Sequence, residues 1–181
     1  MTKFFILILI IILIVVGGFF FIANYTYTQR QGEITIKPDY KNIEYIVEGQ
    51  TVKLINGYSE MEVVMGSASK IITKYFGNEA YGDLNGDEIS DIVFLITQEG
   101  GGSGTFYYAV AALNTDLGYH GTNAVFIGDR IAPQTTEIRN GEIIINYADR
   151  KPDEPMINQP SVGVSKYLKI LEGKLVDENK K

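Results

Sequence analysis

The chain begins with an unbroken apolar run over residues 4–23, made almost entirely of Ile, Leu, Val and Phe. A helix of about 20 residues is about 30 Å long, which matches the hydrocarbon core of a bilayer. A cleaved signal peptide is the competing interpretation, but its apolar region is normally about 7–15 residues long and ends in small residues. The pattern predicts a transmembrane anchor over residues 1–24, with the lipid bilayer as the partner of residues 4–23.

The segment after the anchor, residues 25–40, is polar and predicts a stalk or linker. Lys3 and the short N-terminal head favour the cytoplasm for the start of the chain, whereas Arg30 and Lys37 on the other flank argue against it. The large acidic region that follows favours export. We therefore expect a single-pass protein of the cell membrane, with its C-terminal domain on the extracytoplasmic side.

Beyond the stalk, apolar residues alternate with polar ones or form short runs between turn residues. The runs at residues 91–97 and 105–113 are continuously apolar, which is typical of strands buried on both faces. Asn140-Gly141 between two further runs is the strongest hairpin signal. No segment after residue 25 has a sustained helical period. The prediction is an all-β fold, a single compact and mostly antiparallel domain of about 7–10 short strands over residues 41–176, with a charged tail over 177–181.

Composition narrows the chemistry. The 181 residues include no cysteine and one histidine, which excludes disulfides, thiolate metal sites, cysteine nucleophiles and multi-histidine zinc sites. The formal net charge is −6, and an acidic domain repels phosphates and attracts cations. Nucleic acid is therefore not an expected partner.

The acidic loop, residues 83–91, gathers the most oxygen ligands. Hard cations such as Ca²⁺ take six to eight oxygens, usually from short acidic loops of this spacing. The predicted calcium ligands are three side-chain oxygens, one backbone carbonyl and a final carboxylate, from Asp83, Asn85, Asp87, Ile89 and Asp91 respectively.

Two further residues shape this loop. Gly86 allows the tight turn that brings the oxygens together. Glu88 occupies the sixth position, where such loops usually have glycine, and a glutamate tolerates a positive φ poorly. The competing interpretation of the loop is an Asn-Gly turn whose acids are simply solvated.

The acidic loop resembles the calcium loops of integrin-type FG-GAP repeats, in which an Asp-x-Asp/Asn-x-Asp-Gly-x-x-Asp pattern precedes an apolar strand. Six blocks of the chain resemble a group of membrane-anchored envelope proteins of small-genome bacteria, for which no activity is established; they are residues 66–70, 74–79, 82–87, 101–108, 128–136 and 146–152. The central part is more distantly similar to LppP/LprE-type lipoproteins, although the chain lacks their lipid-bearing cysteine. These resemblances imply an envelope location and a domain boundary.

Four other features have a functional and a structural interpretation. The glycine-rich segment 100–104 is either an anion cradle or a hairpin connection, and lacks the lysine of a P-loop. Arg130 and Arg150 either form a fork for a carboxylate or sugar, or pair with nearby acids. His120 is either a general base or a surface residue of a loop. Four tyrosines either form a platform on which a carbohydrate ring stacks or pack in the core; they are Tyr75, Tyr81, Tyr107 and Tyr147.

Together these features predict a membrane-tethered extracytoplasmic β-domain that acts as a binding or structural module of the cell envelope and is stabilised by Ca²⁺. Its partner would be a cell-wall polymer or a neighbouring envelope protein. The alternative is an envelope hydrolase that cleaves glycans with two carboxyl groups, since such enzymes need neither histidine nor cysteine.

Overall fold

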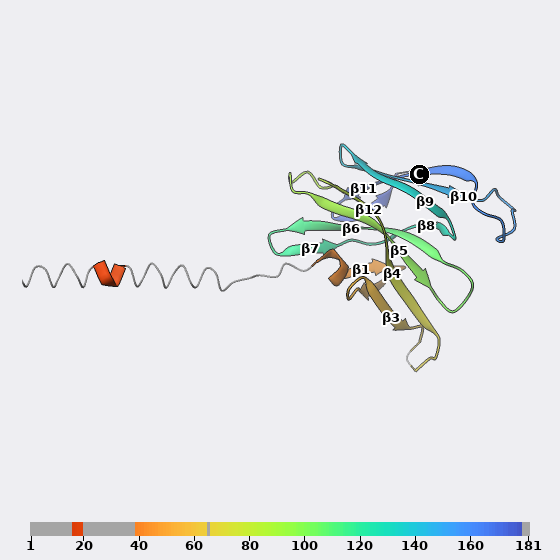
Figure 1. Ribbon diagram of the computed structural model, residues 1–181, viewed down its shortest axis with the longest axis horizontal. Helices are drawn as coiled ribbons and strands as arrows, with labels where there is room; N and C mark the ends of the chain where they lie inside the picture. Colours follow the sequence, from red (N-terminus) through yellow and green to blue (C-terminus); the bar gives the residue numbers. More distant parts are fainter. Residues whose placement is uncertain (1–15, 20–38, 65, 179–181) are drawn as a thin grey trace, which may run out of the picture. The chain divides into compact units, whose positions relative to one another are not determined.

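The computed structural model describes residues 16–19, 39–64 and 66–178, and the chain divides into two units, Met1–Ile36 and Lys37–Lys181 (Figure 1). In the first unit only residues 16–19 are described, and they are helical. The rest of the predicted membrane span and nearly all of the predicted stalk lie outside the described residues. Within the described part of the chain, no helix has the length and apolar character needed to cross a membrane.

The described residues of the second unit form twelve β-strands and one short 3₁₀-helix, η1 (Tyr40–Asn42). A hairpin forms the first sheet, in the order β1 (Glu44–Val47), β2 (Gln50–Lys53). The largest sheet runs β3 (Tyr58–Glu62), β4 (Lys70–Gly82), β5 (Asp91–Glu99), β6 (Phe106–Thr115), β7 (Gly118–Gly121), and β8 (Val125–Asp129) also pairs with β6. The third sheet runs β12 (Lys174–Asp177), β11 (Val162–Leu171), β10 (Glu142–Asp149), β9 (Ala132–Arg139).

All paired strands are antiparallel, so the predicted all-β, antiparallel class is confirmed. The twelve strands exceed the seven to ten expected. One reason is β7, which lies in a segment that the sequence predicted to be a loop. His120 is on this strand and is exposed, facing away from the core.

Strand β5 lies at the centre of the domain and is buried on both faces. On one face, Val93 and Leu95 belong to the same buried cluster as Ile143 and Leu168 of the four-stranded sheet. The alternate residues of β5, such as Phe94, pack on the other face against the β1–β2 hairpin. The domain therefore has three layers, and the prediction that the continuously apolar strands are central is confirmed (Figure 1).

Four tight turns follow one rule. Each has a left-handed residue followed by a left-handed glycine, the backbone of a type I′ hairpin turn, whose twist matches that of the flanking strands. The four pairs are Glu48-Gly49, Asn56-Gly57, Asn140-Gly141 and Glu172-Gly173. The hairpin predicted at Asn140-Gly141 is confirmed, with Arg139 paired to Glu142.

A tyrosine cluster holds the start of the domain, and we use this name for Tyr40, Tyr75 and Tyr81 around Glu79. The Glu79 carboxylate accepts hydrogen bonds from Tyr40 at 2.8 Å, from Tyr81 at 3.1 Å and from Tyr75. The Lys41 ammonium lies 3.9 Å from Glu79 and 3.9 Å from the Tyr75 ring centroid. Burial alone raises the pKa of Glu79, but the three hydroxyls outweigh it and hold that pKa below its ordinary value.

The tyrosines considered as a stacking platform do not form one surface. Tyr147 is buried in the core, while Tyr75 and Tyr107 are half-buried against opposite faces of the central sheet. Only Tyr81 is more than half exposed, and its hydroxyl is bound to Glu79. Core packing therefore accounts for most of these rings.

Candidate functional site

The acidic loop joins β4 to β5 and is anchored at both ends. Leu84 is buried in the core, and Gly82 just before it lies so close to Ile138 of β9 that a Cβ at residue 82 would meet that side chain at 3.0 Å. The loop therefore sits on the edge of the four-stranded sheet, and its position is fixed by packing.

Asp83 is the hydrogen-bonding centre of the loop. Its Oδ1 accepts from the backbone N–H groups of Gly86 at 2.7 Å and Asn85 at 3.2 Å, and its Oδ2 accepts from Glu88 at 3.0 Å. These N–H groups, with Gly86 and Glu88 contributing most, lower the pKa of Asp83 because they stabilise the carboxylate. Asp83 is therefore ionised at neutral pH and holds the turn closed.

The next two predicted ligands are linked to each other. The Asn85 amide nitrogen donates to Asp87 Oδ2 at 2.9 Å, and the Asp87 backbone N–H donates to Asn85 Oδ1 at 3.0 Å. Asp87 Oδ1 accepts from the backbone N–H of Ile89 at 2.8 Å. The structure thus links the side chains at loop positions three and five through the Asn85 amide nitrogen, and it fixes the backbone at position seven.

The loop adopts the left-handed backbone at the position where glycine was expected. Glu88 has a φ of 65°, and Gly86 has a φ of 86°. A left-handed backbone costs a residue with a Cβ about 1–2 kcal/mol. The loop therefore keeps its turn in spite of an unfavourable residue, and the bond from the Glu88 N–H to Asp83 helps to hold it there.

Asp91 differs from the other predicted ligands because it is completely buried. Its Oδ2 accepts from the backbone N–H of Leu84 at 3.0 Å, and its Oδ1 accepts from that of Asn114 at 2.7 Å. Burial raises the pKa of Asp91, and the nearby carboxylates of Asp87 and Asp83 raise it further, while its two N–H donors oppose the shift. Asp91 therefore ties both ends of the loop to the end of β6.

The loop offers the kind of oxygen that a hard cation binds, because the alternate positions 83, 85 and 87 carry carboxylate and amide groups. Within the described residues, no three His, Asp or Glu side chains lie close enough together to hold a metal ion. The remaining loop oxygens come from Asn85 and from the backbone. The structure thus does not bring the three predicted carboxylate ligands, Asp83, Asp87 and Asp91, into one such group. A cation held by the predicted set, which also includes Asn85 and the Ile89 carbonyl, would have to draw these oxygens closer together.

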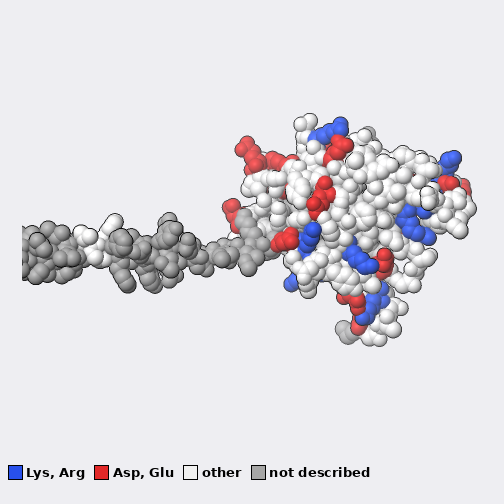
Figure 2. All heavy atoms as spheres, viewed as in Figure 1, with Lys and Arg blue, Asp and Glu red and all other residues white. Residues whose placement is uncertain are grey.

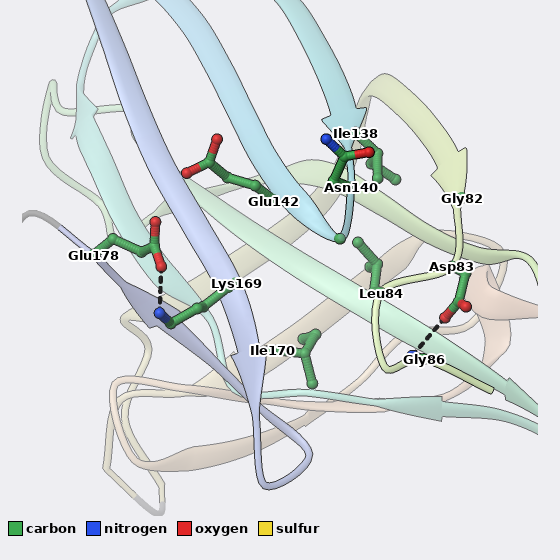
Figure 3. Close-up of a pocket in the computed structure, with 11 residues that line it drawn as sticks. Gly82, Asp83, Leu84, Gly86, Ile138, Asn140, Glu142, Lys169, Ile170 and Glu178 are labelled. Atoms are coloured by element: carbon green, nitrogen blue, oxygen red, sulfur yellow. Dashed lines mark hydrogen bonds and ion pairs between the residues drawn. The ribbon is translucent and has the colours of Figure 1, made fainter. Parts of the chain in front are cut away.

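A hollow of about 760 Å³, which we call the loop hollow, opens beside the acidic loop (Figure 3). Its apolar lining is Leu84, Ile138 and Ile170, and its polar lining includes Asp83, Asn140, Glu142, Lys169 and Glu178. Figure 3 shows Glu142, Lys169 and Glu178 on the side away from Asp83.

The loop hollow brings together carboxyl groups with different acidities. The nearby carboxyl group of Glu178 raises the pKa of Glu142, because two carboxylates close together disfavour each other's ionisation. An ion pair with Lys169 lowers the pKa of Glu178. Asp83, on the other wall, has a lowered pKa. The sequence alone does not indicate this pair, since Glu142 and Glu178 are far apart in the chain and neither belongs to a motif.

The glycine-rich segment and the two arginines have structural partners. Residues 100–105 connect β5 to β6, as the hairpin interpretation predicted. The Arg130 guanidinium donates to Asp129, its neighbour in sequence, at 2.7 Å. Arg150 donates to the backbone carbonyls of Arg130 at 2.9 Å and Asn158 at 2.7 Å. The arginines lie close together, and their contacts brace the turns at one end of the domain.

The charged side chains on the face shown in Figure 2 are of both signs and are interspersed among large uncharged areas. A single-signed stripe that would follow a charged polymer does not cover that face.

Comparison of the chain with known proteins found no matching family model, no matching curated protein and no matching solved structure.

Proposed function

We propose that the protein is a membrane-tethered module of the cell envelope, with its β-domain on the extracytoplasmic side, and that Ca²⁺ in the acidic loop stabilises this domain. The apolar run of residues 4–23 supports the tether, because its length fits a bilayer. The resemblance of six sequence blocks to envelope proteins would imply the same location.

The connection made by Asp91 carries the calcium part of this proposal. The loop's last carboxylate is buried and bound to Leu84 and Asn114, so it belongs both to the loop and to the central sheet. A cation would relieve the repulsion that Asp83 and Asp87 impose on the buried Asp91 carboxylate. A ligand that binds only the folded loop stabilises the domain by RT ln(1 + [Ca²⁺]/Kd). Ca²⁺ would thus act as a structural ion.

The tether is tested by fractionation of cells that express the full chain. The proposal expects the protein in the membrane fraction after extraction with alkaline carbonate and in the soluble fraction only after detergent. Protease added outside spheroplasts should digest the β-domain. Release by carbonate, or protection of the domain in intact spheroplasts together with digestion after lysis, would overturn the tether or its orientation.

A glycan hydrolase is the second candidate, and the loop hollow favours it. Hydrolysis needs one protonated and one ionised carboxyl group. Two carboxyl groups meet this need when their surroundings raise the pKa of one and lower the pKa of the other. Glu142 has the raised pKa and Asp83 the lowered one, and both line the hollow. Glu142 would donate its proton to the glycosidic oxygen as that bond breaks, and Asp83 would stabilise the positive charge that develops on the sugar. Water would then attack the sugar and give a proton back to the Glu142 carboxylate.

The enzyme is tested by release of reducing ends from isolated envelope polysaccharide. A hydrolase predicts release by the wild-type chain and its loss in both Asp83→Asn and Glu142→Gln, with Asp116→Asn in an exposed turn as the matched control. Polysaccharide left intact by the wild-type chain would remove this candidate and leave the binding module.

A further inference from the structure

A second hollow, of about 510 Å³, lies away from the acidic loop and is formed where the three layers of the domain meet. We call it the β8 groove. Its lining comes from the β1–β2 turn, from β8 and the residues before it, and from β11 and β12, as Glu48, Asn123, Ala124, Val125, Phe126, Lys166, Leu175, Val176 and Asp177. None of these residues belongs to the acidic loop or to the loop hollow.

One residue that lines the β8 groove, Phe126, is aromatic and belongs to a partly exposed row of rings that continues beyond the groove. Phe126 is 45% exposed, and its ring centroid lies 5.4 Å from that of Tyr108 and 6.4 Å from that of Phe106. Phe106 is itself 39% exposed. The pairing of Tyr108 with Phe126 across β6 and β8 fixes this row of rings on a sheet. The row is therefore a rigid apolar surface that the domain itself leaves uncovered.

The rest of the groove is polar and held in place. The Lys166 ammonium lies 3.0 Å from Asp177 Oδ2, and their side chains are only 20% and 9% exposed. The Asn123 amide makes two hydrogen bonds to the backbone of Leu175, at 2.8 Å and 3.0 Å. Glu48 also lines the groove, and its carboxylate adds to the effect of burial in raising the pKa of Tyr108 to about 12. Charged groups of both signs, from Glu48, Lys166 and Asp177, thus line the same groove as Phe126.

This combination matches a sugar ring better than other ligands. A pyranose presents an apolar face of C–H groups, which packs on an aromatic ring, and hydroxyl groups around its edge, which need both donors and acceptors. Glu48 and Asp177 disfavour a phosphate chain because they repel it. A purely apolar partner would bury the charged groups of the rim at a cost in desolvation.

We propose that the β8 groove binds a pyranose unit of an envelope polysaccharide, with the sugar stacked on Phe126 and its hydroxyls bonded to Glu48, Lys166 and Asp177. This inference rests on the proposed role as an envelope binding module and names the chemistry of its ligand. The aromatic row makes the site tolerant of sugar identity, while the fixed ion pair orients the ring.

The test is binding of the detergent-solubilised full chain to an array of oligosaccharides, followed by titration of the strongest binder. Phe126→Ala should weaken binding about tenfold or more, and Phe126→Tyr should retain it, because stacking requires an aromatic ring. The matched control is Phe76→Ala, which removes a phenylalanine of similar exposure, 44%, that contacts Tyr107 on the opposite face of the sheet. Melting curves identify any variant that fails to fold.

An array on which no oligosaccharide binds the wild-type chain, or binding that Phe126→Ala leaves unchanged in a folded protein, would overturn the inference. Either result would leave the tether and the calcium site untouched, since those are measured by membrane extraction and by melting. Conversely, if carbonate releases the protein from membranes, the tether fails, but binding of sugar to the β8 groove can still be measured.

Discussion

The buried carboxylate of Asp91 is the point where the acidic loop and the central sheet depend on each other. Replacing Asp91 with alanine removes the acceptor of two backbone N–H groups, those of Leu84 and Asn114, in a site with no exposure to water. Hydrogen bonds to a charged group contribute about 1.5–3 kcal/mol each. Part of this sum is offset because the variant no longer buries a charge. We expect Asp91→Ala to lower the free energy of unfolding by about 2–4 kcal/mol.

The assay is thermal melting of the full chain in detergent, followed by the β-sheet circular dichroism signal in the presence of a chelator. For a domain of this size the expected loss corresponds to a fall in Tm of roughly 10 °C. Asp116→Ala, which removes an exposed aspartate in the β6–β7 turn, serves as the control and should melt within about 2 °C of the wild type. If Asp91→Ala melts as the control does, the buried carboxylate does not link the loop to the sheet.

The acidity of Asp91 gives the same experiment a second readout. Its pKa is raised in the fold, so the folded state holds the proton more tightly than the unfolded chain does. Asp91 therefore contributes most stability below its unfolded pKa of about 3.9, and this contribution is lost as pH rises through the raised folded value. Asp91→Asn should remove that loss, so its stability relative to the wild type should improve as pH rises through this window. A constant difference between the two proteins would contradict the raised pKa.

Three further predictions concern stability and are measured by melting in chelator. Glu79→Ala removes the acceptor of three tyrosine hydroxyls and should destabilise the domain by about 2 kcal/mol, with Glu79→Gln losing about half as much. Glu88→Gly relieves a left-handed glutamate and should leave stability unchanged or raise it by up to about 1 kcal/mol; a clear loss would refute the backbone argument. Gly121→Ala places a Cβ 2.1 Å from the Glu44 carbonyl oxygen and should cost about 3 kcal/mol or more, whereas Gly163→Ala, which meets nothing within 4 Å, should be near neutral.

Local patterns were sufficient to predict the central strands and the tight turns. The continuous apolar residues of β5 and β6 indicated burial on both faces, and left-handed residue–glycine pairs such as Asn140-Gly141 indicated hairpins. Both features depend on neighbouring residues alone. Strand β7 could not be found in this way, because its four residues include Gly118 and Gly121 and have no apolar pattern; pairing with β6 forms it.

The partners of individual side chains were also beyond the sequence. Tyr40 was expected in the stalk, yet its hydroxyl binds Glu79 and its ring packs 5.5 Å from that of Phe94. The spacing of the acidic loop predicted five ligands for one cation, and of these the structure joins Asn85 and Asp87 by hydrogen bonds. It did not indicate that Asp91 is buried, because the donor Asn114 comes from a strand that only the folded sheet brings near.

The loop hollow and the β8 groove were not predicted because each is lined by residues from segments far apart in the chain. Phe126 and Phe106 were unremarkable as strand residues. Their exposure follows from the position of β8 beside β6, where neither the β1–β2 hairpin nor the four-stranded sheet covers the rings completely.

The most direct test of the account is the effect of Ca²⁺ on the melting of the full chain. A Ca²⁺ concentration of about ten times Kd should raise the free energy of unfolding by about 1.4 kcal/mol, or Tm by roughly 5 °C, relative to chelator. Asp87→Ala should abolish the rise, and Asp116→Ala should keep it. A Tm that does not change at millimolar Ca²⁺, or a rise of the same size in Asp87→Ala, would contradict a calcium site in the acidic loop.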